Sequence, residues 1–189
     1  QKSLLFENQH IERLIKASRY FSYPFDAEYL KKKIEEECRA CDINQDYRLR
    51  ISLSKSGKIE LSRQILTPLT PTFCKAKICL QEANLQQAFT YFKTTHRPHL
   101  SLGEQEEIYH NTKGELLETS IGNLVLKIAG KLYTPPIRLG ILPGIYRQHL
   151  LETGQVEEKV LTLADLAQAE AIYGCNAVRG LYELSMKEN

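Results

Sequence analysis

The first forty residues carry apolar side chains at the three- and four-residue intervals of amphipathic α-helices. The positions that share one face of the first predicted helix are Ile11, Leu14, Ile15 and Ser18. They predict a helix over about residues 9–21, and the apolar run before it predicts a short strand over residues 4–6. Pro24 ends this helix, and the side chain of Asp26 can cap a second one that runs to about Arg39.

Further along, apolar and polar residues alternate with the two-residue period of a half-buried β-strand. This alternation covers residues 47–53, and a second strand is expected over residues 59–66, after a Lys-Ser-Gly-Lys turn. Pro68 and Pro71 cannot continue a central strand, because proline has no backbone donor. A third strand is expected over residues 75–80.

These elements predict a small α+β domain over residues 1–80, a polar interdomain linker over residues 81–88 and a larger α/β domain over residues 89–189. In the larger domain, helices are expected over residues 142–153 and 162–167, the second capped by Thr162 and Asp165. Strands are expected over residues 108–111, from 116 onward, 124–128, 131–133, 156–161 and, as the last, 171–175.

Composition limits the function only loosely. The chain of 189 residues is 25% charged and 42% hydrophobic with a net charge of +2, so it offers no argument for a nucleic-acid or membrane partner. Five cysteines, an odd number, favour a reducing cytoplasm over a disulfide framework. Cys38 and Cys41 form a Cys-x-x-Cys pair, but without a second pair we expect no metal site.

Candidate chemistry begins at Lys93, in the motif Tyr-Phe-Lys-Thr-Thr-His-Arg of residues 91–97. A single lysine in polar company is ordinarily a solvated surface residue. Three motifs follow it: Glu-Thr-Ser-Ile-Gly-Asn at residues 118–123, Leu-Pro-Gly-Ile-Tyr-Arg at 142–147 and Cys-Asn-Ala-Val-Arg-Gly at 175–180. Together they supply what pyridoxal 5'-phosphate (PLP) needs, which is an amine, an acid for the ring nitrogen and backbone donors for the phosphate.

The order and the amino-acid sequences of these motifs resemble those of the class IV, fold-type IV PLP enzymes. The two-domain α+β fold of these enzymes is that of D-amino acid aminotransferase. Within this family the Lys-Thr-Thr-x-Arg wording resembles aminodeoxychorismate lyase, and most closely the form fused behind aminodeoxychorismate synthase component I. The resemblance extends from His10 to Gly180. It implies that the first family strands are missing before Gln1, and that the segment over residues 98–107 is shorter than the helix usual there.

The resemblance also implies roles for particular residues. Lys93 would be the catalytic residue that binds the cofactor covalently, and Arg13, in His-Ile-Glu-Arg-Leu, would reach the phosphate. Glu118 would pair with the pyridine nitrogen. The phosphate would also meet Gly144 and the backbone N–H groups of Ile145 and Tyr146, while Asn176 would contact the cofactor from the other side, and Arg97 and Arg179 would hold substrate carboxylates.

The function expected from this resemblance is conversion of 4-amino-4-deoxychorismate to 4-aminobenzoate and pyruvate in folate synthesis. The alternative is a class IV aminotransferase acting on branched-chain or D-amino acids with the same cofactor residues. A third reading is a non-catalytic remnant or interaction module. The family resemblance further implies a homodimer with the site near the subunit interface, and a synthase domain ahead of Gln1 in a longer protein.

Overall fold

A computed structural model describes residues 2–81, 87–101 and 103–186, and it divides the chain into two compact units, Gln1–Pro68 and Leu69–Asn189. The division comes twelve residues before the predicted end of the first domain at residue 80. The reason is that the third predicted strand, β3 (Lys75–Leu80), pairs with β4 and β10 of the second unit. Most of the predicted linker, residues 82–86, lies outside the described residues.

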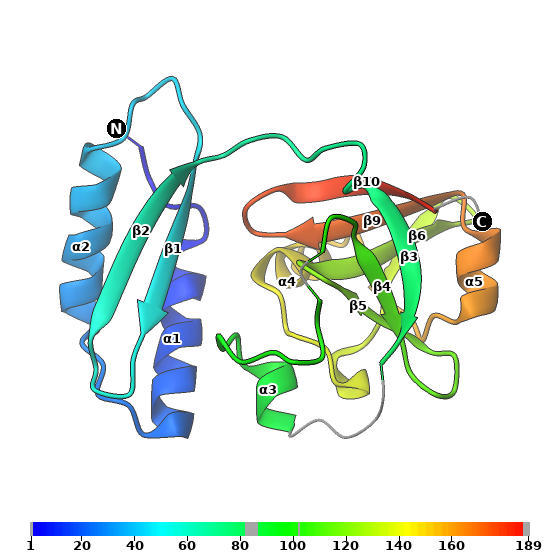
Figure 1. Ribbon diagram of the computed structural model, residues 1–189, viewed down its shortest axis with the longest axis horizontal. Coiled ribbons are helices and arrows are strands. Elements are labelled where there is room, and N and C mark those ends of the chain that lie inside the picture. The colour runs from blue at the N-terminus through cyan, green and yellow to red at the C-terminus, as the bar shows by residue number, and fades with distance from the viewer. Residues whose placement is uncertain (1, 82–86, 102, 187–189) are drawn as a thin grey trace. The chain divides into compact units, whose positions relative to one another are not determined.

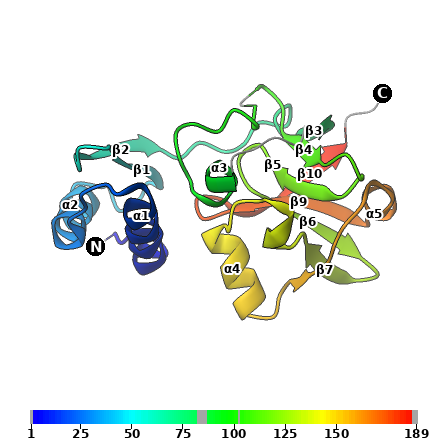
Figure 2. The same ribbon diagram turned by 90° about the horizontal axis from the view of Figure 1, so that it is seen from below.

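The first unit consists of two helices and a β-hairpin: α1 (Glu7–Phe21), α2 (Ala27–Arg39), β1 (Tyr47–Leu53) and β2 (Ile59–Ile65). Both helices lie on the same side of the hairpin (Figure 2). Ile11, Leu30 and Ile34 are buried there, against the alternate residues Leu49, Ile51, Ile59 and Leu61 of the hairpin. The hairpin therefore has one apolar face and one polar face, as the alternation predicts.

Of two local predictions for this unit, the cap at Asp26 is confirmed and the strand over residues 4–6 is wrong. The carboxylate of Asp26 accepts a hydrogen bond from the Tyr29 N–H at 2.9 Å, which confirms the predicted cap of α2. The strand expected over residues 4–6 does not form. Phe6 instead takes a left-handed conformation with φ 55° and is the N-cap of α1, so its apolar run leads into a helix.

The second unit is organised around an eight-stranded sheet with the order β5-β4-β3-β10-β9-β6-β7-β8. An additional pairing of β5 with β6 closes six of these strands into a barrel, which Figure 1 shows wrapped around its core. The remaining strands are β4 (Glu107–His110), β5 (Leu116–Thr119), β6 (Asn123–Ile128), β7 (Lys131–Thr134), β8 (Glu157–Glu158), β9 (Ala171–Asn176) and β10 (Gly180–Met186).

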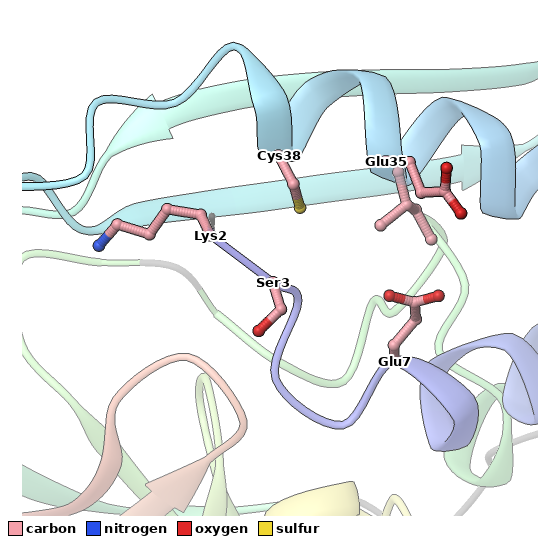
Figure 3. Close-up of a pocket in the computed structure, with 6 residues that line it drawn as sticks. Lys2, Ser3, Glu7, Glu35 and Cys38 are labelled. Carbon is pink, nitrogen blue, oxygen red and sulfur yellow. The ribbon is translucent and has the colours of Figure 1, made fainter.

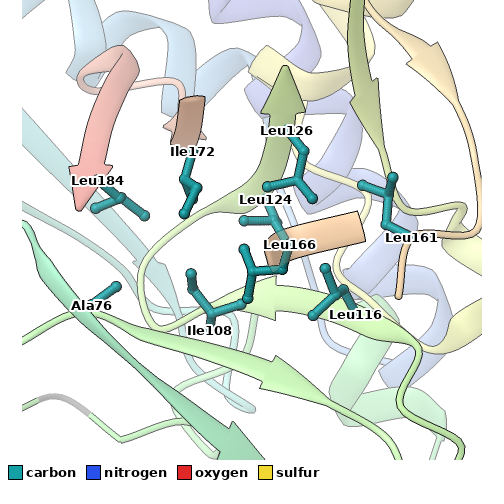
Figure 4. Close-up of a cluster of buried hydrophobic side chains, with 9 residues drawn as sticks. All are labelled: Ala76, Ile108, Leu116, Leu124, Leu126, Leu161, Leu166, Ile172 and Leu184. Carbon is teal, nitrogen blue, oxygen red and sulfur yellow. The ribbon is translucent and has the colours of Figure 1, made fainter. Parts of the chain in front are cut away.

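Inside the barrel, nine side chains from strands, helix and loop pack into one apolar cluster (Figure 4). They are Ala76, Ile108, Leu116, Leu124, Leu126, Leu161, Leu166, Ile172 and Leu184. Burial of one leucine or isoleucine side chain stabilises a fold by roughly 1.5–3 kcal/mol. This cluster therefore fixes the strands whose ends carry the candidate site.

The helices of the second unit are α3 (Gln87–Tyr91), a 3-10 turn η1 (Ile137–Leu139), α4 (Ile145–Glu152) and α5 (Leu163–Gln168). Thr162 and Asp165 form the predicted capping box of α5. Helix α4 begins three residues later than predicted, because Gly144 is still extended with φ −68° and ψ 138°.

Two strand predictions in this unit were wrong. The strand expected over residues 156–161 shrinks to the two residues of β8, since Val156 and Leu161 turn into the core while the residues between them lie on the surface. β9 is not the last strand, because β10 pairs antiparallel with it after a turn at Asn176–Gly180.

Candidate active site

Glu118 lies where the barrel closes, and a β-bulge sets the direction of its side chain. Between two pairs of the β4–β5 ladder, Ile108 with Thr119 and His110 with Leu116, β5 has one residue more than β4. Leu116 packs in the barrel core, so without the bulge Glu118, two residues on, would share its face. The extra residue turns Glu118 to the opposite face.

Asn123 is the direct cross-strand partner of Glu118, and it alternates with the core residue Leu124. The two polar side chains therefore share the face away from the core. Both contact the backbone of the same residue: the Leu142 N–H donates to the Glu118 carboxylate, and the Asn123 Nδ2 donates to the Leu142 carbonyl at 2.8 Å. Two of the predicted motifs are thus joined through one residue.

The start of α4 packs closely against Asn123. Gly144 is the N-cap of this helix, and a Cβ placed on it would lie 2.0 Å from the Asn123 Oδ1. Only glycine fits this contact. Because Gly144 offers no capping side chain, the N–H groups of the first turn of α4 and the positive end of its dipole form a surface suited to an anion.

Glu118 is a buried carboxylate with 2% of its surface exposed. Its Oε1 lies 2.9 Å from the Nη2 of Arg97, which is itself largely buried. Burial raises the pKa of Glu118 to about 7, against the opposing effects of the Arg97 charge, the Leu142 N–H and the Lys93 charge. A carboxyl group whose pKa lies near neutral pH can change its charge when a cationic or protonated ligand binds beside it.

Lys93 lies in an exposed position two residues after α3 ends at Tyr91. Its ammonium is close enough to Glu118 to lower the pKa of that carboxyl. The sequence predicts an amine and an acid that act on the same cofactor, and in the structure the charge of Lys93 acts on Glu118. The predicted covalent bond of Lys93 to the cofactor stays a prediction.

The fourth motif forms the tight turn between β9 and β10, next to the second and third motifs. Asn176 caps this turn, since its Oδ1 accepts hydrogen bonds from the N–H groups of Val178 and Arg179, each at 3.0 Å. Its Nδ2 contacts the Ile121 carbonyl at 3.3 Å. The amide of Asn176 therefore has partners inside the chain, and its predicted cofactor contact stays a prediction.

Tyr146, on the first turn of α4, lies against the same β9–β10 turn. Gly180 has φ +68°, and a Cβ on it would lie 3.3 Å from the Tyr146 hydroxyl. Helix α4 is thus adjacent both to Asn123 and to the turn that carries Arg179. Three of the four predicted motifs are brought together by these contacts, and Lys93 and Arg97 join them through Glu118.

Sequence reasoning missed a second buried carboxylate. Glu106 is fully buried, its Oε2 accepts a hydrogen bond from the Tyr182 hydroxyl at 3.1 Å, and its Oε1 lies 3.2 Å from the Ile121 N–H. Burial raises the pKa of Glu106. Its contacts connect the turn after Glu118 with β10, a strand that the sequence pattern did not predict.

His99 was also missed. Both of its ring nitrogens, and the Nε of Arg97, are buried without a hydrogen-bond partner among the residues that the structure describes. Burial, with the neighbouring charge of Arg97, lowers the pKa of His99 to about 4. The imidazole is therefore neutral at physiological pH. The position of His99 two residues after Arg97 is the only sequence signal for it.

Arg13 lies on α1 in the first unit, where its Nη2 is 3.3 Å from the His10 Nδ1. Its predicted contact with a phosphate stays a prediction. A cavity of about 290 Å³ in the same unit is lined by Lys2, Ser3, Glu7, Ile34, Glu35 and Cys38 (Figure 3). None of these side chains belongs to the motifs predicted to bind the cofactor, so we place the candidate site at Glu118 and not in this cavity.

The described part of the chain contains no helix that is both long and apolar enough to cross a membrane. Among the same residues, no three metal-binding side chains gather closely enough to hold an ion.

Comparison with known proteins gives several likenesses. A Haemophilus influenzae protein of uncharacterised function is 34% identical over 79 residues, 42% of this chain, and the chain spans 41% of that protein's length. A Mesorhizobium loti structure, provisionally assigned as an amino-acid aminotransferase, has a TM-score of 0.81 at 25% identity, with 95% of this chain and 91% of that chain covered. The structure of 4-amino-4-deoxychorismate lyase from Pseudomonas aeruginosa has a TM-score of 0.69 at 20% identity, with 96% and 77% covered.

These likenesses confirm the predicted fold class, a mixed α+β fold of the fold-type IV aminotransferase kind. A family model described as amino-transferase class IV matches residues 1–185, nearly the whole chain. The chain therefore belongs to the class IV aminotransferases, a family of PLP-dependent enzymes.

Proposed function

We propose that this chain is a PLP-dependent lyase that converts 4-amino-4-deoxychorismate to 4-aminobenzoate and pyruvate. The observation that carries the proposal is the convergence of Lys93, Arg97 and the Leu142 N–H on the buried carboxylate of Glu118. Among class IV enzymes, the wording Lys-Thr-Thr-His-Arg at residues 93–97 and Asn-Ala-Val-Arg-Gly at residues 176–180 resembles the lyases. The fold of the chain is compatible with this choice, since the Pseudomonas aeruginosa lyase has the same fold, which aminotransferases also share.

The surroundings of Glu118 fit a protonated pyridine nitrogen. A carboxylate offers about four lone-pair sites, and Arg97 and Leu142 account for two donors. A third donor can therefore be accepted. The added positive charge of a pyridinium would also stabilise an anion that burial disfavours. Glu118 would in turn keep that ring nitrogen protonated.

The start of α4 fits a phosphate. Gly144 provides no side chain to cap the start of α4, so the backbone N–H groups of Ile145 and Tyr146 can donate to a ligand oxygen. We propose these two residues and Gly144 as the phosphate contacts of the second unit. Arg13 of the first unit and Asn176 are further proposed contacts from the family resemblance.

Lys93 would perform the proton transfers. When bound, PLP supplies an electron sink for the bond that breaks beside the substrate nitrogen. Lys93 would hold the cofactor covalently at rest and, once the substrate amine has displaced it, would take the proton from the ring carbon that carries the amine. The exposed position of Lys93 allows both the displacement and the transfer.

The overall reaction needs no oxidant or second substrate. The ring carbon loses a proton, the C–O bond of the enolpyruvyl ether breaks and the ring becomes aromatic. The departing enolpyruvate takes up a proton and becomes pyruvate. The substrate has two carboxylates, and we propose that Arg179, on the β9–β10 turn, holds one of them.

An amino-acid aminotransferase is the second candidate, and the likeness to the Mesorhizobium loti structure favours it. The same residues would hold the cofactor, with branched-chain or D-amino acids as substrates. A homodimer, implied by the family resemblance, is proposed for either function.

The fate of the substrate distinguishes the two candidates. Incubation of the PLP-loaded protein with 4-amino-4-deoxychorismate should give 4-aminobenzoate and pyruvate in equal amounts without a keto-acid acceptor. The Lys93→Ala variant is the matched negative control. If the protein instead accumulates pyridoxamine phosphate with leucine or D-alanine and needs 2-oxoglutarate to turn over, it is an aminotransferase and the lyase proposal is wrong.

A further inference from the structure

We infer that Arg97 is a positioning residue that keeps the buried carboxylate of Glu118 charged and fixed in direction, and not an anchor for a substrate carboxylate. This inference rests on the proposed function in so far as Glu118 is the partner of the cofactor ring. It replaces the role that the sequence resemblance gives to Arg97. It rests first on geometry: the Arg97 Nη2 lies 2.9 Å from the Glu118 Oε1, and their side chains are 15% and 3% exposed.

A carboxylate buried this deeply needs a permanent counter-charge. Removing the charge from water disfavours the ionised form, and it raises the pKa of Glu118 to about 7 even with Arg97 in place. After burial, the largest influence on this pKa is the charge of Arg97, which lowers it. Without that charge, Glu118 would be protonated at neutral pH and could not favour a protonated pyridine nitrogen.

Arginine suits this role better than the other nearby cation, Lys93. A guanidinium does not lose its proton in proteins. Lys93, by contrast, must be neutral when it acts as nucleophile or base. If Lys93 were the main counter-charge, the charge of Glu118 would change each time the lysine titrated. Because the charge of Arg97 affects the pKa of Glu118 more than the charge of Lys93 does, the titration of Lys93 changes the ionisation of Glu118 less.

The remaining contacts of Arg97 agree with this assignment. Its Nη2 donates a hydrogen bond to Glu118, while its Nε is buried and has no hydrogen-bond partner among the described residues. The titratable neighbour on the same loop, His99, has a pKa lowered to about 4 and carries no charge at neutral pH. The ionisation of Glu118 therefore depends on Arg97 and, to a smaller extent, on Lys93 and the Leu142 N–H.

The direct test is a titration of Glu118 in the cofactor-free chain by carbon-13 NMR of its carboxyl group, assigned by its loss in Glu118→Gln. In Arg97→Gln the pKa of Glu118 should rise by about one pH unit or more, the usual effect of an adjacent guanidinium. Arg97→Lys should restore part of the difference. Arg138→Gln, at an exposed arginine, is the matched control and should leave the titration unchanged. An unchanged titration in Arg97→Gln would overturn the inference whether or not the chain binds PLP.

Cofactor binding and kinetics separate positioning from substrate binding. Arg97→Gln should weaken the binding of PLP roughly tenfold to a hundredfold, the range for loss of a charge-assisted hydrogen bond, and should lower kcat with little change in KM. A substrate anchor would instead raise KM and leave PLP binding intact, which contradicts the inference. If the wild type itself fails to bind PLP while the titration shows the coupling, the proposed function fails and the Arg97–Glu118 coupling stands.

A double variant keeps the test decisive if Arg97→Gln folds poorly. In Arg97→Gln alone, Glu118 must take up a proton when the chain folds at neutral pH, which costs stability. Arg97→Gln with Glu118→Gln has no ionisable group at either position and should unfold at a higher urea concentration. A double variant that is no more stable than the single one would show that the two residues are not coupled. That result also overturns the inference.

Discussion

Glu118 and Asn123 face each other across the hairpin that closes the barrel, and between them they bind the backbone N–H and the backbone carbonyl of Leu142. This relationship ties the position of a carboxylate to the start of α4. A substitution at the start of α4 should therefore alter the position of the Glu118 carboxylate, and a substitution of Glu118 should alter the start of α4. Gly144, which touches Asn123, provides the most direct way to test this.

Gly144→Ala should disturb the site without changing any charge. The new Cβ would fall 2.0 Å from the Asn123 Oδ1, so the Asn123 amide must move and its hydrogen bond to the Leu142 carbonyl is lost. A buried carbonyl without a partner costs about 1–3 kcal/mol, and urea unfolding should show a loss of this size. Binding of PLP should weaken as well. Gly103→Ala is the control, since its Cβ would meet nothing nearer than 3.9 Å. Equal stability and affinity in both variants would contradict the packing described here.

The stability of the cofactor-free chain should depend on pH through Glu118. Its folded pKa is about 7, above the ordinary value of 4.5, so the unfolded chain ionises first. The contribution of this carboxyl is therefore full below pH 4.5 and is lost as the pH rises through 7. Since one pKa unit corresponds to about 1.4 kcal/mol, the loss is on the order of 3 kcal/mol.

Urea unfolding of wild type and Glu118→Gln, between pH 4.5 and 8, measures this contribution. The wild type should lose stability relative to Glu118→Gln as the pH rises, while Glu104→Gln, at an exposed glutamate, should follow the wild type. A difference that grows in the opposite direction would mean that Glu118 is stabilised as an anion in the folded chain. In that case the effect of Arg97 would exceed that of burial.

Lys93 should be the residue that binds the cofactor covalently. Borohydride treatment of the PLP-loaded chain should bleach its yellow colour, and peptide mapping should find the label on Lys93. Lys93→Ala should give no stable label, whereas Lys113→Ala, at another exposed lysine, should be labelled like the wild type. A covalent label that persists in Lys93→Ala would move the cofactor elsewhere in the chain.

Local patterns predicted much of this fold because they act over few residues. The alternation over residues 47–53, the cap at Asp26 and the capping box at Thr162 all reappear in the structure. The start of the chain shows the limit of such patterns: residues 4–6 are apolar enough for a strand, yet no neighbouring strand pairs with them.

The parts that could not be predicted depend on contacts distant in sequence. β3 looks like a third strand of the first domain, and only its pairing with β4 and β10 assigns it to the second unit. The bulge that turns Glu118 away from the core is visible only in the register of β4 and β5. The motifs identified the residues of the candidate site, but not that Arg97 would be bound to Glu118.

The sequence resemblance gives Arg97 and Arg179 the same role, to hold substrate carboxylates. Substitution of Arg179 should nevertheless change the kinetics differently from substitution of Arg97. Arg179 lies on a turn that Asn176 caps, beside Tyr146 of α4, and is proposed to meet a substrate carboxylate. Arg179→Gln should raise KM for 4-amino-4-deoxychorismate with a smaller effect on kcat, because a lost ground-state contact weakens binding of substrate and transition state alike. The increase should be roughly tenfold to a hundredfold if one charge-assisted hydrogen bond is lost.

PLP affinity and the titration of Glu118 should stay at their wild-type values, and Arg138→Gln serves again as the control. A fall in kcat with unchanged KM would show that Arg179 acts on the cofactor or the reacting atoms, and the substrate carboxylate would then need another partner.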